Sequence, residues 1–204
     1  PLIRPWVKGV AAERLSLLRV AEYTIRAQVA DRWRRGNMFI LGDAAHLTPP
    51  FIGQGLCAGL RDAMNLSWKL AGVIEDWLPP TVLDSYQEER KPHARYMIRF
   101  ALAVGAAMTA GGGTGDLLRR LVVPRLHLIP GVRDKIMDST TPALHSSDLV
   151  LKSRHRRHLA GGLCPNPVLE EGKRLDEVAG RRFAVISAEP LGQAQRAEIS
   201  RRGA

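Results

Sequence analysis

The stretch from residue 42 to residue 71 combines a carboxylate, a loop rich in proline and glycine, and the expected start of a helix. A short apolar strand at 37–41 is expected to deliver Asp43 to a turn, where its carboxylate can accept hydrogen bonds from ligand hydroxyls. A helix predicted from Gly55 onward brings unpaired backbone N–H groups and the positive end of a helix dipole to the same place. This combination suits a ligand that carries both hydroxyl groups and an electron-accepting ring.

The glycines of this loop strengthen that interpretation. Gly53, Gly55 and Gly59 have no Cβ, so they let the backbone approach a flat ligand and permit positive φ. Each part also has a purely structural interpretation, because Gly-Asp pairs commonly form turns and glycines commonly serve packing. Only the ordered combination favours a binding site.

One apparent motif within the stretch is rejected. Gly53-x-Gly55-x-x-Ala58 matches the dinucleotide-binding pattern, and Glu75 and Asp76 lie about 20 residues further on, where that pattern has its acidic residue. These acids continue the same predicted helix, 56–77, with no strand between, so no βαβ unit is present.

We expect the other polar side chains near the loop to have structural roles. His46 has no nucleophile or carboxylate at triad spacing, so we expect a histidine that is hydrogen-bonded within the turn. Arg61, Asp62 and Lys69 are expected on the polar side of the helix, where they form ion pairs. Residues 86–90 are expected to form a structural helix face.

Composition narrows the function classes. The chain of 204 residues can form one sizeable core or one and a half domains. The net charge of +10 invites nucleic-acid binding, but aromatic residues are only 5% of the chain and are not interleaved with the basic runs. The most apolar window, 100–110, is too short to cross a bilayer. Cys57 and Cys164 lack metal-ligand spacing, which favours a reducing cytoplasm without a zinc site or disulfide framework.

The chain is expected to divide into 1–140, a linker at 141–160 and a further unit at 161–204. Within the first part, short sheet edges are predicted at 15–25 and 27–29. A second helix is predicted from Thr81 or Asp84, bent or restarted at Pro92. A glycine loop at 111–115, helical pieces at 117–123 and 132–137, and a strand at 182–188 complete the prediction.

Taken as a whole, the stretch resembles the second flavin-binding motif of the FAD-dependent aromatic hydroxylases, the single-component class A flavoprotein monooxygenases. The resemblance runs from Tyr23 to about Met97, is most specific over residues 42–69, and is closest to the 3-(3-hydroxyphenyl)propionate hydroxylase-like branch. It resumes at 162–186, where Leu-Cys-Pro-Asn-Pro and the later Phe-Ala-Val-Ile are similar to the entry of a thioredoxin-like C-terminal domain. The implied fold is α/β, α+β within this chain: the C-terminal part of a glutathione-reductase-like FAD-binding domain plus the start of a thioredoxin-like domain.

The resemblance implies roles by position. Asp43, which follows Gly42, would hold the ribityl chain of FAD, and Pro49 and Pro50 would line the reaction face of the ring. With Gly53 in the same loop, the amides of three residues would meet N1 and O2 of the flavin: Gly55, Leu56 and Cys57. Relatives often have Asn in place of Cys57, a change that a backbone contact tolerates.

The implied reaction is the hydroxylation of a phenol with O₂, in which NADPH or NADH reduces FAD. The family's N-terminal Gly-x-Gly-x-x-Gly unit, its middle Asp-Gly motif and most of its substrate-facing sheet have no counterpart in these residues. The chain therefore resembles the C-terminal portion of a hydroxylase, with half of a flavin site. The phenol, the choice between NADH and NADPH, and a homodimeric state stay open.

A second hypothesis comes from a different class of protein. The helical region and tail would serve as a non-catalytic dimerisation or interaction module, associated with a complementing chain. A well-behaved monomer in size-exclusion chromatography with light scattering would count against the module.

Overall fold

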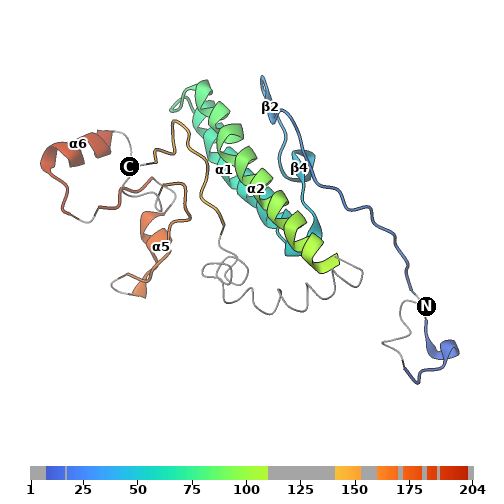
Figure 1. Cartoon of the computed structure of the whole chain (residues 1–204). Coiled ribbons are helices and arrows are strands. Elements are labelled where there is room, and N and C mark those ends of the chain that lie inside the picture. Colours follow the sequence, from blue (N-terminus) through green and yellow to red (C-terminus); the bar gives the residue numbers. More distant parts are fainter. Residues whose placement is uncertain are drawn as a thin grey trace.

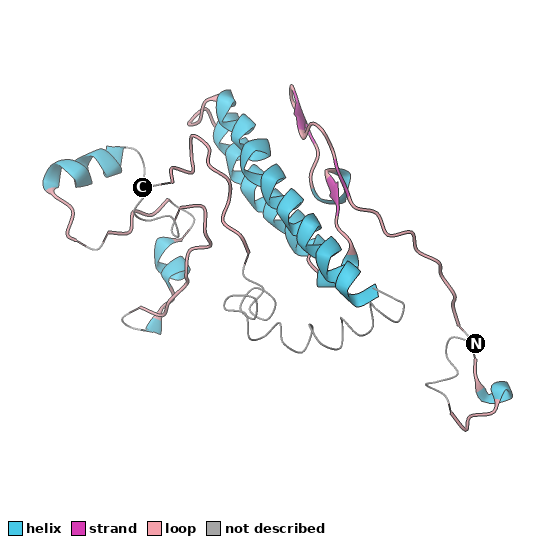
Figure 2. Ribbon diagram, viewed as in Figure 1, coloured by secondary structure: helices cyan, strands magenta, loops and turns pink. Residues whose placement is uncertain are grey.

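The computed structural model describes residues 8–16, 18–109, 141–152, 160–169, 172–180, 183–187 and 189–201. The predicted glycine loop at 111–115 and the helical pieces at 117–123 and 132–137 lie outside these residues. Two long helices, α1 (Gly55–Ile74) and α2 (Asp84–Thr109), lie side by side (Figure 1). The strands are short, and most of the described chain is helix or loop (Figure 2).

The smaller elements surround this helix pair. The strands are β1 (Gln28–Val29), β2 (Arg34–Arg35), β3 (Met38–Phe39) and β4 (His46–Leu47). Single 3₁₀ turns are η1 (Ala12–Arg14), η2 (Gly42–Ala44), η3 (Pro50–Ile52) and η4 (Pro80–Leu83). The C-terminal part contains α5 (Leu175–Ala179) and α6 (Gln193–Arg201).

Helix α1 begins at Gly55, as the sequence predicts, but ends three residues earlier than Trp77. The N–H of Trp77 donates to the carbonyl of Gly72 at 3.0 Å, and the N–H of Asp76 donates to Val73 at 3.4 Å. Asp76 has a φ of 58°. This is the Schellman arrangement, in which a left-handed residue closes the helix before the proline pair 79–80 is reached.

Helix α2 starts at Asp84 and continues through Pro92 without interruption. Of the two predicted effects of Pro92, the restart is therefore wrong, and the bend stays a prediction. Pro92 removes one backbone donor from the helix, but the residues on either side remain helical because tertiary packing compensates: Tyr86, Ala94 and Ala101 are buried against neighbouring elements.

The strands are shorter and less buried than expected. Of the predicted strand 37–41, only Met38–Phe39 pairs, antiparallel with Arg34–Arg35 across a turn in which Gly36 has a φ of 59°. Leu41 is 38% exposed, so the apolar run is not a buried strand. Because β3 pairs with β2 alone among the described strands, and over only two residues, the other side of this apolar run has no neighbouring strand. Of the predicted sheet edges, the described residues form a strand only at Gln28–Val29, antiparallel with β4.

The core lies between α1, α2 and the β1–β4 pair. Trp33 and Tyr86 are its largest side chains, with ring centroids 5.6 Å apart. The Tyr86 hydroxyl donates to the carbonyl of Ile40 at 3.0 Å, which ties the segment that precedes Gly42 to α2. The other buried members of this cluster are Ala45, Leu66, Leu83 and Ala94.

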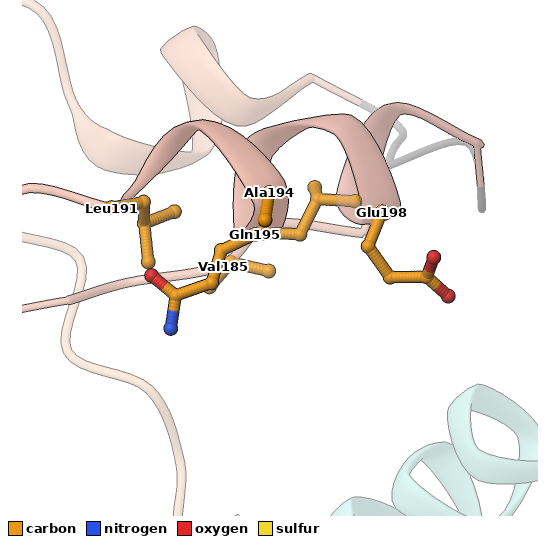
Figure 3. A pocket seen from close by; sticks show the side chains of 6 residues that line it. Val185, Leu191, Ala194, Gln195 and Glu198 are labelled. Carbon is orange, nitrogen blue, oxygen red and sulfur yellow. The ribbon is translucent and has the colours of Figure 1, made fainter.

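The C-terminal residues contact α1 through Phe183. Its ring packs edge-on against Trp68 and Trp77, at centroid distances of 5.4 and 5.8 Å. Residues 183–187 have no regular secondary structure and no strand partner among the described residues, so the predicted strand at 182–188 is not formed there. Next to them, α6 and Val185 border a shallow apolar groove of about 500 Å³ (Figure 3).

Candidate functional site

The turn that carries Asp43 is pressed against the first turns of α1. Gly42 has a φ of 56°, and a Cβ on Gly59 would lie 3.3 Å from the Gly42 Cα. Glycine at both positions lets the two backbones meet with no side chain between them. This contact sets the position of Asp43 relative to the helix N-terminus.

Asp62 holds the same turn from inside the protein. Its carboxylate accepts from the Gly42 N–H at 3.0 Å, pairs with His46 Nε2 at 2.8 Å and accepts from Arg90 Nε at 2.8 Å. The Asp62 side chain is fully buried, so its predicted place on a polar helix face is wrong, although the predicted ion pair is confirmed. The predicted hydrogen-bonded His46 is also confirmed, with Asp62 as its partner instead of the turn.

The charge state of Asp62 follows from these partners. Burial by itself raises the pKa of a carboxyl group, but the hydrogen bond with His46 and the charge and hydrogen bond of Arg90 outweigh it. The pKa of Asp62 is therefore below its ordinary value, and the carboxylate stays ionised as the acceptor for Gly42. The helix-to-turn connection is thus fixed by a charge-assisted hydrogen bond.

Asp43 itself points to the outside. It is exposed within η2, and it borders an open hollow of about 460 Å³ together with residues of β1 and β4. Its carboxylate is the acidic group in the lining of that hollow. An exposed carboxylate beside a hollow can accept hydrogen bonds from the hydroxyls of a ligand.

The loop between Asp43 and α1 is anchored to α2. Pro49 is buried and Pro50 is exposed, so the proline pair presents one ring inward and one outward. The ring of Phe51 packs on Gly105 so closely that a Cβ at Gly105 would overlap it. Gly53 then reverses the chain with a φ of 63°, and a Cβ built there would meet nothing within 4 Å.

The N-terminus of α1 is open. Gln54 is its N-cap and makes no side-chain capping hydrogen bond, while the first helical bond runs from the Ala58 N–H to the Gln54 carbonyl at 2.9 Å. The N–H groups of Gly55, Leu56 and Cys57 are those that a helix leaves without an internal acceptor. Leu56 is 78% exposed, so this end is accessible.

A second buried polar cluster lies further along the same helices, and the sequence analysis did not predict it. Glu89 accepts from Lys69 Nζ at 2.8 Å, from Asn65 at 2.7 Å and from Ser147 at 2.6 Å. Lys69 is fully buried, not on a polar face as predicted. The four-residue spacing of Asn65 and Lys69 put them on one side of the helix, but nothing in the sequence identified their partner on α2.

The cluster ties residues beyond the long helices to α2. Burial raises the pKa of Glu89, but its three hydrogen bonds and the charge of Lys69 shift it below the ordinary value. The same carboxylate accepts from Ser147, and the N–H of His145 donates to the Glu89 carbonyl at 3.5 Å. Residues 141–152 are therefore held against α2 by polar contacts.

These features fit one end of a flavin. An exposed carboxylate faces outward from a turn, glycines leave open space along the loop, and three helix N–H groups point out of α1 with the positive end of its dipole. The donors suit the anionic pyrimidine edge of a reduced flavin, and the carboxylate suits a polyhydroxyl chain. No cluster of three or more potential metal ligands, and no helix with the length and hydropathy of a membrane span, occurs in the described ranges.

Comparisons with known proteins agree with this arrangement. Residues 7–101 match the family described as FAD binding domain. The chain is 36% identical over 192 residues to 3-(3-hydroxy-phenyl)propionate/3-hydroxycinnamic acid hydroxylase 2 of Burkholderia vietnamiensis (strain G4 / LMG 22486), covering 91% of this chain and 35% of that protein. A segment of 97 residues is 45% identical to the probable NADH-specific resorcinol 4-hydroxylase of Rhodococcus jostii (strain RHA1), covering 48% of this chain and 18% of that protein.

A solved structure of the rebeccamycin biosynthetic enzyme RebC with reduced flavin has a TM-score of 0.63 and 25% identity, over 86% of this chain and 37% of that one. Residues 7–101 thus match the FAD-binding-domain family, and the expected resemblance to the FAD-dependent aromatic hydroxylases is confirmed. The chain spans about a third of the length of the curated relatives that it matches.

Proposed function

We propose that this chain forms the ribityl and pyrimidine end of the FAD site in an aromatic monooxygenase. The observation that carries the proposal is the juxtaposition of the exposed Asp43, the open glycine loop and the uncapped N-terminus of α1. The family match over residues 7–101 supports the same cofactor. We further propose that the ADP half of FAD is bound by residues outside 1–204.

Within this proposal each residue has a defined task. Asp43, positioned by Gly42, accepts hydrogen bonds from the ribityl hydroxyls. The exposed Pro50 borders the reaction face with the buried Pro49 directly behind it, while Gly53 lets the loop pass close to the ring. The N–H groups of three residues donate to N1 and O2 of the ring: Gly55, Leu56 and Cys57.

The proposed reaction is the hydroxylation of a phenolic substrate by O₂. The bound flavin supplies the chemistry of oxygen activation, after reduction by NADH or NADPH. The protein's residues orient the ring and stabilise negative charge on its pyrimidine edge through the α1 N-terminus. The names of the relatives, a hydroxyphenylpropionate hydroxylase and a resorcinol hydroxylase, support a phenol as substrate.

The proposal extends to organisation and location. Residues 1–140 are assigned to the FAD-binding and hydroxylase domain, 141–160 to a linker and 161–204 to the start of a thioredoxin-like domain. We propose a cytoplasmic location, because the spacing of the two cysteines favours a reducing compartment. A homodimer is the proposed assembly.

Flavin binding by the chain tests the proposal. Because only the ribityl and pyrimidine end is contacted, FAD, FMN and riboflavin should bind with affinities within about threefold of one another, a difference below 1 kcal/mol. Quenching of flavin fluorescence on titration with protein measures this. Tight stoichiometric binding of FAD alone would contradict the half-site proposal. Phenol-dependent oxidation of NADH or NADPH, measured on the product of the whole reading frame, tests the hydroxylation itself.

A further inference from the structure

A cavity of about 220 Å³ lies between the two long helices and the segments at 141–144 and 161–163. None of the flavin-loop residues 42–57 lines it. Its polar lining includes Arg61, His93 and Thr141, and its apolar lining includes Met64 and Leu163. The remaining lining residues are Asn65, Arg90, Pro142, Leu144, Gly161 and Gly162.

Several polar atoms in this lining are buried without a hydrogen-bond partner among the described residues. They are Nη1 of Arg61, Oγ1 of Thr141 and both ring nitrogens of His93. His93 is only 3% exposed, so its ring is shielded from bulk water, although two other lining residues, Met64 and Leu163, are 74% and 77% exposed. A buried polar atom that lacks a partner costs about 1–3 kcal/mol, so four of them around one cavity indicate a polar occupant.

The charges around the cavity do not balance. Arg90 is matched by Asp62 at 2.8 Å, and Lys69 by Glu89 at 2.8 Å. Arg61 has no carboxylate partner in the ion pairs of the described residues. Burial lowers its pKa, the nearby Cys57 raises it, and the charge of Arg90 lowers it further, with a net shift below the ordinary value. Within the part of the chain that the structure describes, one positive charge is thus left without a carboxylate partner, and a water molecule would not neutralise it.

The size and lining of the cavity specify the kind of anion. An apolar cavity of about 150 Å³ is known to hold a benzene molecule, so the larger volume here has room for one small ring and a carboxylate. His93 is buried and uncharged near neutral pH, since burial and the charges of Arg90 and Arg61 lower its pKa to about 4. The site therefore offers one full charge, with neutral donors from His93 and Thr141.

We propose that this cavity is a binding site for a compact monocarboxylate with an apolar body, held by Arg61, His93 and Thr141. Arg61 pairs with the carboxylate, the N–H of the neutral imidazole and the Thr141 hydroxyl donate to it, and the apolar body rests on Met64 and Leu163. This inference does not depend on the proposed flavin function.

Calorimetric titration of the chain with sodium benzoate tests the site, with benzamide as the neutral isostere and acetate as the anion without a ring. Benzoate should bind at least about tenfold more tightly than either, because only it satisfies both the charge and the apolar surface. Equal binding of benzoate and benzamide would overturn the role of the charge. If no binding is detected with about 20 mM sodium benzoate, the complex is weaker than a millimolar one, and this result would overturn the proposed site.

Substitutions in the cavity lining test whether benzoate binds at this cavity. Arg61→Met should weaken benzoate binding at least about tenfold, and Thr141→Val about threefold or more, since hydrogen bonds to a charged group are among the strong ones. The matched control is Arg95→Met, an exposed arginine of α2, the helix that carries His93, that does not line the cavity. If Arg61→Met fails to fold, Thr141→Val carries the test. Benzoate binding that is unchanged in Thr141→Val and in a folded Arg61→Met would overturn the proposal.

Discussion

The Asp62 carboxylate accepts a hydrogen bond from the backbone N–H of Gly42 at 3.0 Å. Asp62 lies in the second turn of α1, whereas Gly42 directly precedes the exposed Asp43. One buried side chain therefore sets the distance between the carboxylate of the loop and the N-terminus of the helix. The proposed flavin site depends on this distance, because both ends must reach the same ligand.

Replacing Asp62 tests that connection. Asp62→Asn removes the buried charge that compensates Arg90, so we expect the free energy of unfolding to fall by about 3 kcal/mol or more. Urea denaturation measures the change. The control is Asp84→Asn, whose carboxylate pairs with Arg34 at 2.8 Å but is 66% exposed, and which should cost less than about 1 kcal/mol. Similar losses for both variants would contradict the role assigned to Asp62.

The buried Lys69–Glu89 pair predicts a strong coupling between two helices. Lys69→Met leaves the Glu89 carboxylate buried without its cation and should destabilise the chain by about 3 kcal/mol. The double variant Lys69→Met/Glu89→Gln removes both charges while Gln can still accept from Asn65 and Ser147. The free energy of unfolding of the double variant should be at least about 1 kcal/mol higher than that of Lys69→Met. Additive losses in this double-mutant cycle would show that the pair does not act as a unit.

The low pKa of His93 predicts a pH dependence of stability. Its pKa is lowered from 6.5 to about 4, so the unfolded chain binds a proton at a higher pH than the folded chain does. Stability should be unaffected by this group above pH 6.5 and should fall by about 3 kcal/mol between pH 6.5 and pH 4. Thermal unfolding across this range measures the slope. His93→Gln should reduce the slope; the same slope in a folded His93→Gln chain would assign the effect to another group.

The backbone contacts proposed at α1 predict a contrast between two substitutions. Cys57→Asn keeps the amide, so flavin affinity should stay within about threefold, below 1 kcal/mol. Gly55→Pro removes an N–H at the first helical position, where proline is tolerated, and should weaken flavin binding about tenfold. Fluorescence titration with FMN compares them. A larger loss from Cys57→Asn than from Gly55→Pro would assign the contact to side chains.

The sequence allowed much of the helical frame to be predicted, but not the interior between the helices. The start of α1 at Gly55 followed from local glycine and proline signals, and α2 from its apolar spacing. The burial of Asp62 and Lys69 could not be predicted, because a charged residue enters a core only when a distant partner neutralises it, here Arg90 and Glu89. The position of Asp43 in a turn could be predicted from its neighbours in the chain, since a turn between a strand and a glycine loop is local information, whereas its role toward a flavin stays a prediction.

The most direct test of the central claim is the affinity of FMN for the Asp43→Ala chain. A carboxylate that accepts hydrogen bonds from ribityl hydroxyls contributes about 1.5–3 kcal/mol, so the dissociation constant should rise at least about tenfold. Asp84→Ala, an exposed carboxylate away from the loop, should leave it unchanged. A folded Asp43→Ala chain that binds FMN as tightly as the unaltered chain would contradict the assignment of this loop to the flavin.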